Sequence, residues 1–433
     1  MNRSRLLAGL LAAALAAPAM GADEPGVFKI PGTESTIKFY GYVQLDSTLD
    51  FTGRPNGIEN SDWATILPAV PANASNYRKN APVQLYFTAR TSRFGIQTST
   101  PTNYGPITVK LEGDFNAPNA FQGETFTNSV IFRLRQAYGS FGGFLAGQTW
   151  STFLDLAAYP DVVDFNSPGT IALVRNPMIR YTFGIAPGTT LAIAAENAAA
   201  SRFGATGVGL PGSPVPPTAA GVADPFKFQT IPDIVANLGF TGGWGSLSVR
   251  GVLQTYNYVG SINPVVGNPP FSTKRTKESL SGAISGAFKV GGDTLVAQFV
   301  GGPGVGRYVF NALGEPFVST NANNDLELWT MYGVHAGYTH VWNKMFRSNL
   351  VFAYSWFTDP KIDGIETPAG SVNAPNQKTY IQGFLNSFWT FAKNAELGVE
   401  YAIGQWSTFT GQGSSAIQGT QNRINATLHY NFY

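Results

Sequence analysis

Six basic side chains lie in short alternating segments of the first half of the chain, at similar distances from tight turns. Each is six to ten residues away from the nearest turn. Because a guanidinium group can bind both oxygens of a carboxylate at once, such a set fits the recognition of small anions and needs no chemical step. The predicted basic set consists of Arg90, Arg93, Lys110, Arg133, Arg135 and Arg180.

No other motif indicates catalysis or a bound cofactor. GGPGVGR at 301–307 has the glycines of a phosphate-binding loop but lacks its lysine followed by serine or threonine. NANNDLE at 321–327 lacks the order of a calcium-binding EF-hand, and His335, His340 and His429 are scattered. No serine, histidine and acid arrangement announces a hydrolase, and the basic residues form no run for nucleic acid. We therefore predict no catalytic residue, metal site, cofactor or nucleic-acid partner.

The N-terminus has the pattern of a secretory signal peptide. Arg3 and Arg5 precede an apolar run over 6–17, which is followed by small residues. The run is shorter than the ~20 residues that a membrane-spanning helix needs. We predict a signal peptide over 1–22, whose removal leaves 26 basic and 26 acidic residues. Any electrostatic function then depends on where the charges lie.

Composition limits how the exported chain can be built. The 433 residues include no cysteine, so disulfides do not stabilise the fold, and only 12% of the residues are charged. No segment after the signal peptide is apolar for long enough to form a membrane helix. A chain without such segments crosses a bilayer only as a closed barrel, because every backbone group must be paired within it. A large water-soluble β-protein is the alternative that composition leaves open.

Alternating polar and apolar residues recur from Thr36 to the end of the chain. They predict about sixteen strands, an even number within the range of bacterial barrels. Tight turns such as Gly142–Gly143 alternate with long polar connections such as 51–82, which is typical of an outer-membrane barrel and unusual for a soluble sandwich. The predicted strands lie at 36–50, 83–99, 105–116, 129–141, 143–150, 177–186, 189–198, 228–241, 244–258, 278–290, 293–302, 328–342, 345–357, 377–392, 395–408 and 420–433.

Three details refine this barrel. The alternation changes phase between Phe87 and Phe94, so we predict a bulge near Ser92 that aims Arg90 and Arg93 inward. The final strand ends on aromatic residues, with Phe432 in the outward phase, which resembles the signal read by the barrel assembly machinery. Aromatic residues recur beside the short turns, where a lipid-facing ring would lie in an interfacial girdle: Phe94, Tyr104, Tyr138, Phe141, Phe144, Phe183, Phe240, Trp244, Trp342, Phe346, Phe391 and Tyr401.

Motifs over residues 28–184 resemble the DcaP-like porins of Gram-negative outer membranes. The resemblance implies a sixteen-stranded trimeric porin that prefers anions such as dicarboxylates. Some members have an N-terminal coiled coil, but the predicted periplasmic segment 23–35 is too short for one. The matching stretches are FKIPGTESTIKFYGYVQLD at 28–46, RTSRFGIQTSTP at 90–101, GPITVKLEGDF at 105–115, LRQAYGSFGGFLAGQTWSTFLDL at 134–156 and PDVVDFNSPG at 160–169.

The resemblance also implies that the loop after the fifth predicted strand folds into the barrel. This loop carries Asp155, Asp161 and Asp164. A basic wall facing an acidic loop would set up a field across the narrowest point, with the arginines solvated by the channel. The alternative is that these charges pair with partners such as Glu112 and Asp114 and only hold the loop in place.

The sequence as a whole predicts an all-β transmembrane barrel over 36–433, with short periplasmic turns, long extracellular loops and a constriction loop. We expect a homotrimer in outer-membrane lipid and lipopolysaccharide, and passive diffusion of small anionic solutes. A weakly selective general porin, an outer-membrane enzyme and a non-conducting adhesin are the alternatives. The sequence does not decide whether Arg175 and Arg202 reach the lumen.

Overall fold

The computed structural model describes most of the chain beyond the N-terminal segment. The predicted signal peptide and Arg202 lie outside the described residues. The described ranges are 24–51, 83–116, 132–164, 166–197, 227–228, 231–259, 274–309, 318–320, 326–328, 330–358, 377–408 and 418–432.

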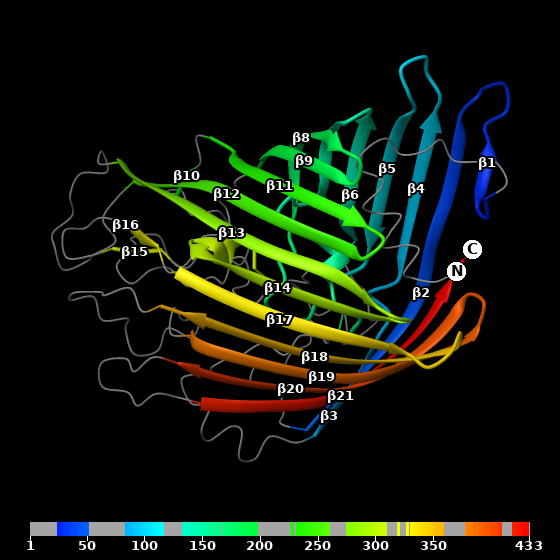
Figure 1. The fold of residues 1–433 in the computed structure, drawn as a ribbon. Coiled ribbons are helices and arrows are strands. Elements are labelled where there is room, and N and C mark those ends of the chain that lie inside the picture. The colour runs from blue at the N-terminus through cyan, green and yellow to red at the C-terminus, as the bar shows by residue number, and fades with distance from the viewer. Residues whose placement is uncertain are drawn as a thin grey trace.

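Sixteen antiparallel strands close into a barrel (Figure 1). The first strand pairs on one side with the second and on the other with the last, which closes the sheet. The barrel strands are β2 (Thr36–Asp50), β3 (Gln84–Thr88) continued by β4 (Arg93–Thr100), β5 (Ile107–Asp114), β6 (Arg133–Phe141), β7 (Phe144–Trp150), β8 (Arg175–Ala186), β9 (Thr189–Glu196), β11 (Asp233–Gly242), β12 (Gly245–Val259), β13 (Lys274–Val290), β14 (Asp293–Pro303), β17 (Thr330–Val341), β18 (Phe346–Phe357), β19 (Gln377–Ala392), β20 (Ala395–Thr408) and β21 (Gln418–Asn431).

The remaining elements are short. Strand β1 (Val27–Lys29) pairs with β2, and β10 (Lys227–Phe228) pairs with β12. Strands β15 (Val318–Thr320) and β16 (Leu326–Leu328) form a separate hairpin. Two 3-10 turns, η1 (Leu156–Ala158) and η3 (Val305–Arg307), follow β7 and β14 along the chain. Among the described residues there is no helix that is both long and apolar enough to span a bilayer.

The predicted strands are confirmed, with ends that differ by a few residues. The predicted irregularity near Ser92 is confirmed too, because one barrel strand is broken there into β3 and β4. Phe87 is in register with Ser47 and is exposed, whereas Phe94 is in register with Gly41 and is also exposed. The break therefore moves the outward face from odd to even residue numbers and turns Arg93 inward.

The two faces of the barrel have opposite chemistry. On the outside, Phe132 and Leu134 are 47% and 42% exposed, and in the last strand Leu428 and Tyr430 are exposed. The inward residues of that last strand, such as Asn425, are polar and buried. An apolar outside around a polar inside is the reverse of a water-soluble protein, so this pattern excludes the soluble alternative and assigns the outer face to lipid.

Most of the aromatic residues predicted for the interfacial girdle face outward beside the turns. Tyr104, Trp244 and Trp342 are among the exposed large side chains of the described residues. Tyr138 is an exception, because it is in register with the inward-facing Lys110. A β-bulge at Arg135 shifts the alternation of β6 before this residue.

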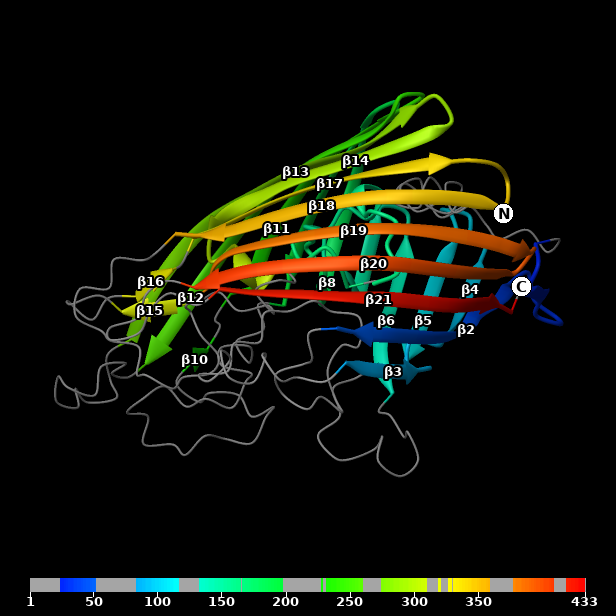
Figure 2. The same ribbon diagram turned by 90° about the horizontal axis from the view of Figure 1, so that it is seen from below.

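The barrel wall and its interior are both uneven. The strands β5 to β7 have seven to nine residues, whereas β12, β13 and β19 have fifteen to seventeen, and the two sets form opposite walls (Figures 1 and 2). Inside, an apolar cluster fills the side of the long strands. It comprises Phe153, Ala172, Val174, Val235, Val252, Ala283, Val300, Val305, Tyr308, Val309, Met331 and Phe357.

Candidate functional site

A β-bulge in β6 brings extra polar side chains to the inside of the short wall. Glu112 of β5 is in register with Gln136, and the next residue, Gly113, is in register with Leu134. Arg135 is therefore the additional residue, and it points inward together with Arg133 and Gln136. The sequence carries a signal for this bulge, because the outward residues change from even numbers at Leu134 to odd numbers at Phe141.

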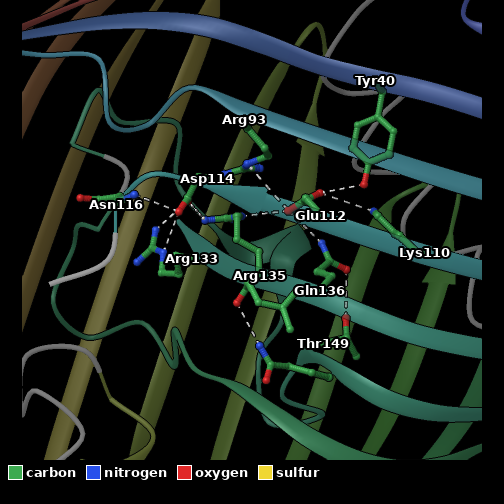
Figure 3. A network of polar contacts seen from close by, with 12 residues as sticks. Tyr40, Arg93, Lys110, Glu112, Asp114, Asn116, Arg133, Arg135, Gln136 and Thr149 are labelled. Carbon is green, nitrogen blue, oxygen red and sulfur yellow. Dashed lines mark hydrogen bonds and ion pairs between the residues drawn. The ribbon is translucent and has the colours of Figure 1, made fainter. Parts of the chain in front are cut away.

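Two carboxylates of β5 lie at the centre of the polar network (Figure 3). Arg133 donates to both oxygens of Asp114, from Nε at 2.8 Å and from Nη2 at 2.7 Å. Arg135 bridges the two carboxylates, with Nε 2.9 Å from Glu112 Oε1 and Nη1 2.8 Å from Asp114 Oδ2. The bidentate contact of Arg133 with Asp114 is the strongest type of ion pair that arginine makes.

Two further cations lie around Glu112. Arg93 Nε is 3.8 Å and Lys110 Nζ is 3.7 Å from its carboxylate oxygens, and the Tyr40 hydroxyl donates to Glu112 Oε2 at 3.0 Å. Arg93 and Arg133 are both in register with Asp114, from opposite sides, so they flank this carboxylate on the two neighbouring strands. Together with Arg133 and Arg135 they form the basic wall, in which four cations surround two carboxylates.

The members of the basic wall differ in their access to solvent. The side chains of Arg133, Arg93 and Lys110 are 26%, 23% and 15% exposed, but Arg135 is only 3% exposed. The expectation that the channel solvates these arginines is therefore wrong for Arg135, whose charge is balanced by Glu112 and Asp114. Since two carboxylates cannot neutralise four cations, the wall keeps an excess of two positive charges.

The other two predicted basic residues, Arg90 and Arg180, are not among the four cations of the basic wall. Arg90 is buried at the break between β3 and β4, where its backbone carbonyl accepts a hydrogen bond from the Phe115 amide. Arg180 occupies an inward position on β8, in register with Leu145 and Ala194. The sequence did not decide whether Arg175 reaches the lumen. In the structure its guanidinium carbon lies 4.4 Å from the centre of the Trp150 ring.

The acidic loop residues make their contacts on the opposite side of the barrel or within the loop. Asp155 Oδ2 accepts from Ser285 of β13 at 2.6 Å, and Asp161 accepts from Arg347 of β18. Asp164 is buried and accepts from Ser167 within the loop at 2.8 Å. Asp155 and Asp161 therefore contact strands on the side opposite the basic wall, and Asp164 contacts the loop itself. These contacts agree with the alternative reading of the sequence, in which the acidic residues hold the loop.

Sequence reasoning missed the wall residues that complete this attachment. Glu400 of β20 accepts from the Val163 amide at 2.9 Å and from the Asp164 amide at 3.1 Å. Arg250 of β12 donates to the Phe153 carbonyl at 2.6 Å. Alternation marks both side chains as inward, but nothing in the sequence shows which loop atoms they meet.

Asp164 gives the loop a predicted pH response. Burial raises the pKa of its carboxyl from 3.8 to about 8, although the nearby Arg423 opposes the shift. A raised pKa means that the seated loop is stabilised fully below pH 3.8 and that this contribution is lost as the pH rises through about 8. Single-channel conductance is therefore expected to increase over this range as the loop loosens. Asp164→Asn should remove that part of the increase, and an identical pH profile for the variant would contradict the assignment.

The family model described as a porin subfamily matches residues 18–421. The chain belongs to this porin family. Porins are channels rather than enzymes. Membership of this family places the protein in the outer membrane of Gram-negative bacteria.

Individual relatives agree with this assignment. Porin Omp2b of Brucella suis is 30% identical over 280 residues, which cover 57% of this chain and 65% of the relative. Outer membrane protein IIIA of Rhizobium leguminosarum is 28% identical over 159 residues, or 36% of this chain and 33% of the relative. The chain thus matches from one third to about two thirds of the length of these relatives.

Solved structures show the same fold over nearly the whole chain. The outer membrane channel DcaP of Acinetobacter baumannii has a TM-score of 0.68 and 23% identity, with 94% of this chain and 99% of that chain covered. An anion-selective porin from Comamonas acidovorans has a TM-score of 0.53 and 12% identity, with 92% and 100% covered. The resemblance to DcaP-like porins is confirmed.

Proposed function

We propose that this porin allows passive diffusion of small hydrophilic solutes and favours anions, including dicarboxylates. The observation that carries the proposal is the excess of two positive charges on the basic wall, where Arg93, Lys110 and Arg133 retain solvent-exposed surface. A cationic wall beside a narrow, low-dielectric passage attracts anions and repels cations.

The arrangement supports a transient contact rather than a tight binding site. Glu112 and Asp114 already occupy part of the hydrogen-bonding capacity of the arginines. A passing carboxylate therefore meets a positive field and a few free donors, which allows it to leave as readily as it enters. In this proposal Arg90 and Arg180 extend the field, and the loop residues Asp155, Asp161 and Asp164 act by holding the constriction.

The same ion pairs favour a second candidate function, a general porin with weak selectivity. If the carboxylates screen the cations well enough, the wall would influence conductance without selecting solutes. The Comamonas acidovorans neighbour, an anion-selective porin, shares this fold and supports the first candidate.

The short wall supports a homotrimer, the assembly that the family resemblance implies. A strand of about eight residues tilted by roughly 45° rises only ~19 Å, less than the ~25 Å apolar band of an outer-membrane barrel. Outside this wall Phe94, Phe115 and Phe132 form an aromatic cluster with ring centres 5.7 to 6.3 Å apart. Contact with other subunits would cover it, while lipid and lipopolysaccharide would surround the long strands and the barrel assembly machinery would read β21.

The anion preference is tested by the zero-current potential of the purified protein in a planar bilayer across a salt gradient. We expect a potential of the sign that anion selectivity produces, and a reduced chloride current when succinate is added. A potential near zero would favour the general porin. A potential of the opposite sign would show that the carboxylates dominate the field.

A further inference from the structure

A second segment enters the barrel besides the loop 151–174. The turn Pro303–Val309 follows the long-loop end of β14, where a surface connection would be exposed to solvent. Instead Val305, Tyr308 and Val309 are fully buried in the apolar cluster, and Arg307 is only 6% exposed. The last five residues of the GGPGVGR motif, which has the glycines of a phosphate-binding loop, belong to this inward turn.

Glycine allows the turn to bend into the lumen. Gly304 has φ 73°, in the left-handed region that side chains disfavour, and a Cβ there would lie 2.8 Å from the Tyr256 hydroxyl. That hydroxyl donates to the Gly304 carbonyl at 3.0 Å, and the Ser281 hydroxyl donates to the Pro303 carbonyl at 3.0 Å. Strands β12 and β13 thus hold the first half of the turn.

A buried carboxylate holds the second half. Asp233, the first residue of β11, is fully buried, and its Oδ2 accepts from the Tyr308 hydroxyl at 2.7 Å. Arg307 Nη1 lies 3.0 Å from the same carboxylate, and Arg307 Nη2 donates to the Asn197 carbonyl at 3.0 Å. Removing one member of such a buried pair leaves an uncompensated charge, so the contact fixes the turn strongly.

The turn also supports the start of the constriction loop. The Tyr308 ring meets the Phe153 ring edge-on, with centres 5.4 Å apart, and Phe153 is fully buried. The side-chain amide of Asn237 on β11 donates to the neighbouring Thr152 carbonyl at 3.2 Å. The turn and the loop therefore pack together against the β11–β17 side of the barrel interior, opposite the basic wall.

We propose that the turn Pro303–Val309 is a second constriction element that sets the size limit for solutes, with Asp233 as the residue that positions it. The inference rests on the channel function of the porin family. It does not depend on the proposed anion preference, because the turn acts by occupying volume and its charges are paired internally.

The test combines Asp233→Asn with a reporter thiol at the turn. Since the chain contains no cysteine, Val305→Cys supplies a single thiol that a membrane-impermeant maleimide can report. In an otherwise native barrel we expect this thiol to be protected, whereas Tyr104→Cys, at a position that is 85% exposed, should react at once. With Asp233→Asn added, labelling at position 305 should be roughly tenfold faster, which corresponds to about 1.4 kcal/mol of lost local stability.

Conductance gives the functional readout. Asp233→Asn should raise single-channel conductance and admit larger polyethylene glycols, with little change in the zero-current potential. The matched control is Asp293→Asn, because Asp293 also accepts from a tyrosine hydroxyl, that of Tyr338, but lies at an exposed short turn. This control should leave conductance unchanged.

A second variant covers the case in which Asp233→Asn fails to fold. Tyr308→Phe removes only the hydroxyl donor and keeps the ring contact with Phe153, so it should shift labelling and conductance in the same direction by less. Unchanged conductance in folded variants would overturn the proposal, even if labelling increased. A shift of the zero-current potential alone would concern the anion preference and would likewise overturn the role in size limitation.

Discussion

Replacing Arg93 and Arg133 together with serine is expected to abolish the anion preference of the channel. The two side chains flank Asp114 on neighbouring strands and keep 23% and 26% of their surface exposed. Without them Lys110 and Arg135 face Glu112 and Asp114, so the excess positive charge of the basic wall falls from two to zero. Arg135 is retained because its buried ion pairs hold the bulge of β6.

The expected size of this effect follows from Coulomb's law. A unit charge about 4 Å from a passing ion contributes ~1 kcal/mol in water, so two such charges attract an anion by roughly thirtyfold and repel a cation by the same factor, which changes the anion-to-cation permeability ratio by roughly a thousandfold before screening. Screening reduces the effect at high salt, where the Debye length falls to ~3 Å at 1 M. The zero-current potential at low and high salt measures both the change and its screening.

A matched variant separates the local field from the total charge. Lys344→Ser combined with Lys393→Ser removes the same number of charges from two exposed positions in short turns. We expect this variant to keep the native potential. If the Arg93 and Arg133 variant kept it as well, the basic wall would not be the selectivity element and the general porin would be the better description.

Replacing Glu400 with alanine is expected to release the constriction loop and to raise single-channel conductance. Its carboxylate accepts from the amides of Val163 and Asp164 and from the side chains of Asn386 and Asn425. Hydrogen bonds to a charged group contribute ~1.5 to 3 kcal/mol each, and here two of them connect the wall directly to the loop. The loss of these two hydrogen bonds should weaken the attachment of the loop by more than its other contacts can offset.

Two further variants make the Glu400 result specific. Glu400→Gln keeps the shape and one acceptor oxygen, so its conductance should lie between those of the native and alanine forms. Glu278→Ala removes an exposed carboxylate of β13 and should behave as the native protein does. A native conductance for Glu400→Ala, in a barrel that remains folded, would show that the other loop contacts suffice.

The barrel could be predicted because the alternation of polar and apolar residues along a strand reflects the medium that each face of the strand contacts. Phe132 and Leu134 next to Arg133 and Arg135 already show that one side of β6 faces an apolar medium and the other a polar one. The same reasoning located the break near Ser92, where the outward residues change from Leu85 and Phe87 to Phe94. Applied to Leu134 and Phe141, it would also have located the bulge that adds Arg135 to the wall.

The partners of the charges could not be predicted, because they depend on closure of the barrel. Asp161 meets Arg347, which is 186 residues away along the chain, and the Val163 amide meets Glu400 at a separation of 237. Each partner is one of many inward polar residues on its strand, and the sequence gives no preference among them. The sequence therefore left open whether the loop carboxylates face the basic wall or hold the loop.

By itself the sequence determined the strand count, the membrane-facing surface and the inward position of most of the basic residues, since these follow from periodicity within single strands. Only the tertiary structure decided that Arg135 is buried between two carboxylates, that the acidic loop is attached to the long-strand wall, and that 303–309 folds inward beside it. These features arise where distant strands and loops meet inside the closed sheet. Such contacts produce no periodic pattern in the sequence of any single segment.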